Sequence, residues 1–326
     1  MKINIKNLTR ASILFAALVS LNSCKKENDN KSINNSPDVS VQDGRILFKN
    51  SDVLRATVTE LTNKNTAYLD AWENNKQFSS LRRDTTSAED LQAFNFPQFF
   101  STFINPNGEY MVGDTIVWYH NGLKHMVPNK DEALLARIKA NQGLSKIKYT
   151  AGSEKIKEQE IKESVQSRGS GKVMQVVLGG GAVDARYQKE FTNDWGHPRK
   201  IVIEIYNYVE AGPIGYNSYL ITRIKQYWKG KSTWKPAGEA MKKYITNLSY
   251  TKGYHNVFNG AYVEVSGTVA AIPASGPQID GNNLEYMIAS TISSNTTTAV
   301  RVTGNYEALV VAPYNSQGFY NVAADW

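Results

Sequence analysis

Lys200-Ile201-Val202-Ile203-Glu204-Ile205-Tyr206-Asn207-Tyr208 decides the fold class of the C-terminal half of the chain. Isoleucine occupies every second position from 201 to 205, and valine, glutamate and tyrosine follow these isoleucines in turn. Side chains of a β-strand point alternately to its two faces, so this period of two predicts a strand with one strongly apolar face.

Seven more segments of the C-terminal half predict strands, and clusters of glycine, proline and asparagine separate them. These segments are 173–178, 185–191, 217–227, 243–250, 261–270, 284–292 and 298–311. About eight strands at this spacing predict an antiparallel, β-sandwich-like or barrel-like domain over residues 172–326. Within it, Trp228 to Trp234 is predicted to form a hairpin tip, and residues 236–242 a single helical turn.

Residues 45–141 predict a small, mainly helical domain that also contains a β-hairpin, which makes the fold class α+β. Apolar residues recur at helical spacing between Val53 and Leu61, with Asn50 or Ser51 as the cap, and a second helix follows through residues 67–72. Further on, an aromatic helical face at 96–103 precedes strands 110–112, 115–120 and 123–127, and Asn129 caps a helix over 130–140. Asn121-Gly122 between the last two strands is a strong tight-turn signal.

Residues 142–171 differ in composition from both halves. Lysine and glutamate alternate in sign through most of the segment, few large apolar residues occur, and it ends in Arg168-Gly169-Ser170-Gly171. This composition is typical of a solvated helix or a linker. We therefore place a charged linker at 142–171, as the boundary between the two domains.

The first 24 residues have the layout of a bacterial secretory signal that ends in a lipidation site. Lys2, Lys6 and Arg10 precede an apolar run over 11–19, which predicts a signal peptide covering residues 1–23. Leu21-Asn22-Ser23-Cys24 resembles a lipobox, in which a lipid is attached to the thiol. The alternative is an ordinary signal peptide, but Cys24 is the only cysteine, and an uncapped lone thiol is an oxidation liability in an exported chain.

The predicted anchor is a set of acyl chains, palmitate among them, on Cys24, followed by a polar tether over residues 24–44. The apolar run is shorter than the roughly 20 residues that a membrane-spanning helix needs. Lys25 rather than aspartate follows the cysteine, which favours the outer membrane of the cell envelope. Glu27 and Asp29 match a surface-export tag only in part, so both the cell surface and the periplasmic face stay open.

The N-terminal half resembles a known group of proteins. A polar tether, the strand DGRILFKN (43–50), paired helices and the turn and hairpin FINPNGEYMVGDTIVWY (103–119) follow one another in this order. The arrangement resembles uncharacterised, domain-of-unknown-function lipoproteins of Bacteroidota over roughly residues 40–140. The resemblance implies a location and a rough architecture, and it brings no catalytic residues.

The sequence contains fragments of motifs for catalysis and for metal or cofactor binding, but each lacks a required residue. No catalytic residue, metal site or cofactor is therefore predicted. Gly230-Lys231-Ser232 ends like a phosphate-binding loop, but Lys225 stands where that motif needs glycine. Ser249 and Lys252 have the spacing of penicillin-recognising enzymes, yet they lie in a predicted strand and no Lys-Thr-Gly follows. His120 and His125 flank the hairpin turn with no carboxylate at metal-binding spacing, so we expect surface histidines.

Charge and aromatic content narrow the choice of partner. The net charge of +7 falls to +4 once residues 1–23, with three basic residues and no acid, are removed, which does not indicate nucleic-acid binding. Aromatic residues cluster over 206–234, where filling the core of the sandwich is the alternative to binding. Tyr227, Trp228 and Trp234 are the candidate ligand contacts, because a polar loop separates the two tryptophans.

The leading hypothesis is a membrane-anchored, non-enzymatic binding module of the envelope with a glycan or another envelope protein as partner. The alternative is a hydrolase of polysaccharide or cell-wall material whose acidic residues the sequence does not identify. An enzyme should show a pocket with convergent carboxylates or a histidine-centred cluster. A binding module should show an exposed aromatic patch or groove instead.

Overall fold

The structure, a computed structural model, describes residues 38–84, 91, 94–120, 123–140, 172–175, 185–192, 196–212, 214–295, 297–310 and 319–325. The predicted signal peptide, Cys24, most of the tether and the predicted linker at 142–171 lie outside these residues. Within the described ranges, no helix combines the length and the apolar character that crossing a membrane requires.

A five-stranded sheet forms the framework of the N-terminal half. Its order is β1 (Val39–Gln42), β2 (Arg45–Phe48), β3 (Glu109–Val112), β4 (Thr115–His120) and β5 (Leu123–Val127), with only the β2–β3 pair parallel. Strand β1 lies in the segment that the sequence assigns to the tether. It pairs with β2 because Asp43 and Gly44 both adopt positive φ, at 51° and 72°, which is the geometry of a two-residue hairpin turn.

Among the described residues of this half, four α-helices and one 3-10 helix follow or precede the strands in sequence. They are α2 (Ser51–Leu61), α3 (Thr66–Asn75), α5 (Gln98–Ser101), η2 (Pro128–Lys130) and α6 (Glu132–Ala140). The predicted cap of α2 is confirmed, since the Asn50 side chain accepts hydrogen bonds from the amides of Asp52 and Val53. The predicted Asn129 cap is wrong. Asn129 adopts a left-handed φ of 58°, and the Asp131 carboxylate accepts the Leu134 amide at the start of α6 instead.

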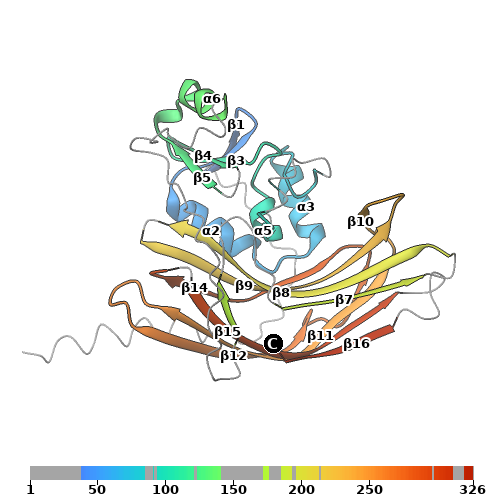
Figure 1. Ribbon diagram of the computed structural model, residues 1–326. Helices are drawn as coiled ribbons and strands as arrows, with labels where there is room; N and C mark the ends of the chain where they lie inside the picture. The colour runs from blue at the N-terminus through green and yellow to red at the C-terminus, as the bar shows by residue number, and fades with distance from the viewer. Residues whose placement is uncertain are drawn as a thin grey trace, which may run out of the picture. The chain divides into compact units, whose positions relative to one another are not determined.

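The described strands of the C-terminal half form two antiparallel sheets, and Figure 1 shows one sheet facing the other. The first contains β7 (Ala185–Thr192), β8 (Pro198–Gly212), β9 (Gly215–Lys229), β10 (Trp234–Pro236) and β14 (Leu284–Ser293). The second contains β6 (Lys172–Gln175), β11 (Met241–His255), β12 (Tyr262–Ile272), β13 (Gln278–Asp280), β15 (Thr297–Val310) and β16 (Phe319–Asp325). The predicted β-rich, antiparallel character is therefore confirmed.

The segment from Trp228 to Lys242 contains one predicted element that is confirmed and one that is wrong. The hairpin tip between Trp228 and Trp234 is confirmed, because β9 and β10 pair across it. The helical turn predicted over 236–242 is wrong: Met241 begins the long strand β11 and pairs with both β13 and β15. Pairing on two edges is compatible with extended backbone and excludes a helical turn at this point.

The apolar face of β8 packs against the second sheet. Ile201, Ile203 and Ile205 are at most 1% exposed. Residues directly opposite each other in an antiparallel pair share a face, so Thr222, which pairs with Ile205, lies on this side. Its hydroxyl lies 2.9 Å from the Tyr306 hydroxyl of β15, and the Lys252 ammonium of β11 donates to the Ser218 carbonyl at 2.9 Å.

The opposite face of β8 and β9 carries aromatic and charged residues that contact the N-terminal half. The ring of Tyr208 lies 5.9 Å from Phe96 and 5.3 Å from Phe100, whose helix α5 stands over this sheet in Figure 1. The Tyr119 hydroxyl donates to Glu210 at 2.6 Å. Residues 36–326 accordingly form one compact unit by their contacts.

Candidate functional site

A cleft of about 430 Å³ lies where the N-terminal half meets the charged face of the first sheet. Arg223, Lys225 and Tyr227 from β9 and Glu285 from β14 line it on the sheet side. Arg223, Lys225 and Tyr227 share this face because the side chains of a strand alternate, so every second residue of β9 points to the cleft. The remaining walls come from the N-terminal half, the last residue of β10 and two loops: Thr66, Leu81, Arg82, Leu91, Asn95, Phe96, Gln98, Ser101, Pro236, Ala237, Gly281, Asn282 and Asn283.

Arg223 is the most highly connected side chain of the cleft. Its Nε lies 2.6 Å from a carboxylate oxygen of Glu285, and its Nη1 donates to the side-chain oxygen of Asn95 at 2.6 Å. Its Nη2 also donates to the Asn95 and Phe96 carbonyl oxygens, at 3.2 and 3.4 Å. The guanidinium stacks 4.0 Å from the centre of the Tyr206 ring. Arg223 therefore ties segment 95–96 to strands β9 and β14.

Lys225, two residues along the same strand, pairs with the buried carboxylate of Glu204. Burial lowers the pKa of the Lys225 ammonium, and neighbouring Arg223 lowers it further, while Glu204 acts in the opposite direction. The resulting pKa is about 8. At pH 7 the cleft thus contains a lysine that is still cationic but that loses its charge a little above neutrality.

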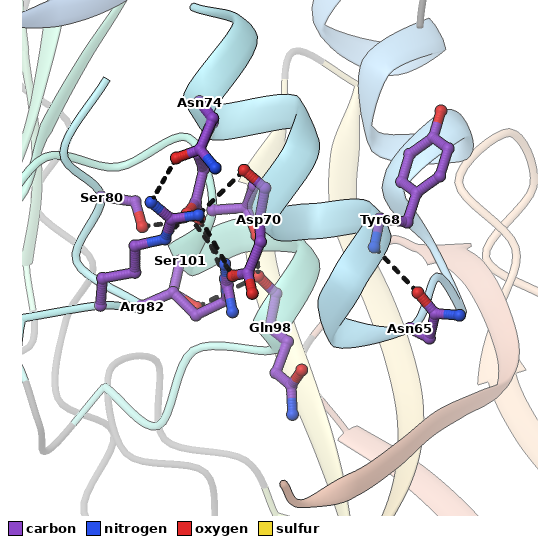
Figure 2. A network of polar contacts seen from close by, with 11 residues as sticks. Asn65, Tyr68, Asp70, Asn74, Ser80, Arg82, Gln98 and Ser101 are labelled. Atoms are coloured by element: carbon purple, nitrogen blue, oxygen red, sulfur yellow. Dashed lines mark hydrogen bonds and ion pairs between the residues drawn. The ribbon is translucent and has the colours of Figure 1, made fainter. Parts of the chain in front are cut away.

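Arg82 lines the cleft and belongs to a partly buried ionic network on the helical side, shown in Figure 2. It donates to Asp70 at 2.5 Å and, through two nitrogens, to Glu73 at 2.9 and 2.8 Å. The Ser80 hydroxyl also donates to Glu73, which is fully buried. Burial alone would raise the pKa of Asp70, but Arg82 and Arg83 outweigh it and hold that pKa below its ordinary value. The network fixes the position of Arg82.

The loop at 280–283 supplies neutral polar groups to the cleft. The carboxylate of Asp280 accepts the backbone amide of Asn282 at 2.9 Å and its side-chain amide at 3.3 Å. The buried Lys243 ammonium donates to the Asp280 carbonyl at 2.7 Å. Asn282 and Asn283 are exposed, so their amide groups are held on a fixed loop and are accessible to solvent.

The structure separates the three aromatic candidates that the sequence analysis groups together. Tyr227 is half-buried and lines the cleft. Trp234 pairs with Lys229 and so shares the face of Tyr227, whereas Trp228, between Tyr227 and Lys229 in β9, points to the other face. The Lys200 ammonium lies 4.4 Å from the Trp234 ring and 5.7 Å from the Tyr227 ring. The three rings therefore do not form one continuous platform.

The expectation of surface histidines is wrong for His125, which is 4% exposed. His120 and His125 lie 5.0 and 4.8 Å from the Trp118 ring, on one face of the β4–β5 hairpin. Burial, together with neighbouring His120, lowers the pKa of His125 to about 4. In the part of the chain that the structure describes, no cluster of histidine, cysteine, aspartate and glutamate is suited to hold a metal ion.

Sequence reasoning missed Arg223, Lys225 and the asparagines of the 280–283 loop. One signal was available, because Arg223, Lys225 and Tyr227 occupy alternate positions of a predicted strand and must share a face. The partners Glu285 and Asn95 carry no such signal. Strand pairing and contacts between the two halves bring them to Arg223.

Comparisons with known proteins give a limited result. No family model matches the sequence, and no curated protein matches it. A crystal structure of a DUF4848 family protein from Bacteroides thetaiotaomicron is similar at 14% sequence identity, over 88% of this chain and 100% of that chain, with a TM-score of 0.21. At this TM-score it assigns no residue a role.

Proposed function

We propose that this chain is a lipid-anchored binding module of the bacterial cell envelope and that the cleft beside Arg223 and Tyr227 binds a glycan. The observation that carries the proposal is the chemistry of the cleft lining. A half-buried tyrosine ring stands near planar amide and guanidinium groups and one lysine. Sugars present apolar ring faces and neighbouring hydroxyls, which such a combination can stack against and hydrogen-bond.

The polar groups of the cleft are held in place before any ligand arrives. Arg223 is fixed by Glu285 and Asn95, and Asn282 is fixed by Asp280. Binding to such groups loses less conformational freedom than binding to mobile side chains, so more of the interaction energy is retained as affinity. This preorganisation supports a ligand site over an incidental gap between two packed parts.

The carboxylates near the cleft support binding over hydrolysis. Glycoside cleavage uses one carboxyl group that donates a proton and a second that acts as base or nucleophile. The Glu285 carboxylate accepts the backbone N–H of Gln98 at 2.6 Å and pairs with Arg223. The Glu204 carboxylate pairs with Lys225 and Arg223. Both groups are engaged by cations of the protein itself, so we retain the hydrolase only as the alternative.

The proposal of a lipid anchor is based on the sequence around Cys24. Acyl chains there would hold the soluble body at the outer membrane, because each buried methylene contributes about 0.8 kcal/mol. The tether between the anchor and β1 would let the cleft face envelope material. We propose an outer-membrane location, at the cell surface or the periplasmic face.

A glycan array probed with the purified chain tests this function. We expect binding to a subset of printed neutral or acidic oligosaccharides, and a loss of at least tenfold for Tyr227→Ala and for Asn282→Ala. Tyr262→Ala is the matched control, because Tyr262 is 50% exposed on β12 and does not line the cleft. Absence of binding to every glycan, or equal binding by all four proteins, would refute the proposal.

A further inference from the structure

The hairpin formed by the end of β9 and by β10, residues 227–236, has a strongly basic tip. Lys229, Lys231 and Lys235 are exposed, and Gly230 donates its amide to the Thr233 carbonyl at 2.8 Å to close the turn. No acidic residue occurs between Lys225 and Gly238. The next acid, Glu239, is held by Arg199 through bonds of 2.7 and 2.9 Å. The positive charge of the tip is therefore not balanced within the hairpin.

Two tryptophans flank this tip, one on each face of the ribbon. Trp234 shares a face with Lys229, and Trp228 shares the opposite face with its pairing partner Lys235. Trp228 is 37% exposed and Trp234 is half-buried. Each ring has an ammonium group nearby: Lys235 is 5.8 Å from Trp228, and Lys229 is 5.7 Å from Trp234. Strand β8 pairs with β9 as far as Trp228, so Lys229 to Trp234 form the tip beyond that pairing. Indole and ammonium groups thus lie on both faces of the sheet where this tip begins.

We propose that this hairpin tip docks edge-on into the headgroup region of an anionic lipid bilayer. Tryptophan favours the membrane–water interface, where its ring is partly in apolar surroundings and its N–H stays hydrated. Lysine side chains keep their ammonium groups among lipid phosphates while their methylene stems follow the apolar part. The combination of basic and indole side chains at one protruding end is suited to that environment.

The placement of the two tryptophans favours a bilayer over a soluble polymer. A glycan chain that stacks on Trp234 lies on one face of the ribbon, and Trp228 on the other face cannot reach it. An interface that surrounds the tip contacts both rings and all three lysines together. The inference concerns the tip alone and stands whether or not the cleft binds a glycan.

Vesicle binding by the full chain carrying Cys24→Ser, which has no thiol to acylate, tests the proposal. The chain is sedimented with vesicles of phosphatidylcholine alone or mixed with phosphatidylglycerol. We expect binding to the anionic vesicles to fall roughly 100-fold when Lys229, Lys231 and Lys235 are all changed to Gln, since each lysine near an anionic surface contributes about fivefold. Changing Lys49, Lys64 and Lys76 to Gln removes the same charge from the N-terminal half and should have little effect.

Fluorescence quenching by brominated lipids adds a direct readout of contact. The chain has six tryptophans, so this experiment uses a Cys24→Ser chain in which Trp195 and Trp326 are also changed to Phe. We expect quenching of tryptophan in this chain and its loss when Trp228 and Trp234 are changed to Phe as well. The two tryptophans that then remain, Trp72 and Trp118, are buried and cannot reach the lipid. The apolar segment at 11–19 is present in every variant, so differences among them report on the tip. Equal binding by the two triple-lysine variants, or unchanged quenching in the double-Phe variant, would overturn the proposal. Binding of the tip to soluble polygalacturonate but not to anionic vesicles would also overturn it.

Discussion

Removal of the Arg223 guanidinium should destabilise the fold because it leaves a buried carboxylate without its cation. In Arg223→Met, Glu285 loses the ion pair at 2.6 Å while its side chain remains 8% exposed. Asn95 loses its hydrogen bond, and Tyr206 loses the cation stacked 4.0 Å from its ring. Glu204 keeps Lys225 as a partner. Removing one member of a buried pair costs about 3–5 kcal/mol, and we expect this variant to lose that amount.

Urea unfolding at pH 7, followed by intrinsic fluorescence, measures this loss. Adding Glu285→Gln to Arg223→Met should recover about 1 kcal/mol or more, because the amide removes the uncompensated charge. Arg55→Met is the matched control: its pair with Asp52 is on the surface, at 74% and 85% exposure, so its loss should cost at most about 1 kcal/mol. A cost below about 1 kcal/mol for Arg223→Met, or no recovery in the double variant, would refute the role given to Arg223.

Three further predictions follow from other groups. The pKa of His125 is about 4 in the folded chain, against 6.5 for an ordinary histidine, so the unfolded state binds more protons between these values. The free energy of unfolding should therefore fall by about 3 kcal/mol as the pH drops through that window, and an equal pH slope in His125→Phe would contradict this. The Lys225 amine should titrate near pH 8 in NMR spectra of ¹³C-labelled lysine, a signal absent from Lys225→Met; an ordinary value near 10.5 would disprove its burial beside Arg223. Cys24→Ala should move the protein from the membrane fraction to the soluble fraction, and unchanged fractionation would rule out the anchor.

The long strands could be predicted from sequence because their signal is local. Alternation at 201–208 fixes which residues share a face, and β8 indeed buries its isoleucines on one side. Short strands carry too few residues for that signal: β10 and β13 have three each and are defined by their partners. The hairpin that includes β1 could have been predicted, because Asp43-Gly44 is a recognised turn pair.

The cleft could not be predicted, since it depends on contacts between distant segments. Arg223 contacts Asn95, which is 128 positions away in the sequence.

The faces on which Trp228 and Trp234 lie could not be predicted from sequence either. Their even separation would place them on one face of a single strand, but a turn lies between them and pairing of Trp234 with Lys229 places them on opposite faces. Only the pairing register, which sequence alternation does not give, decides this.

A crystal structure of the chain soaked with its strongest glycan-array ligand tests the central claim most directly. We predict density for a sugar ring against Tyr227, with hydroxyl groups within hydrogen-bond distance of Asn282 or Arg223. Density for the sugar elsewhere on the surface, with an open and empty cleft, would contradict the assignment of this cleft as the binding site.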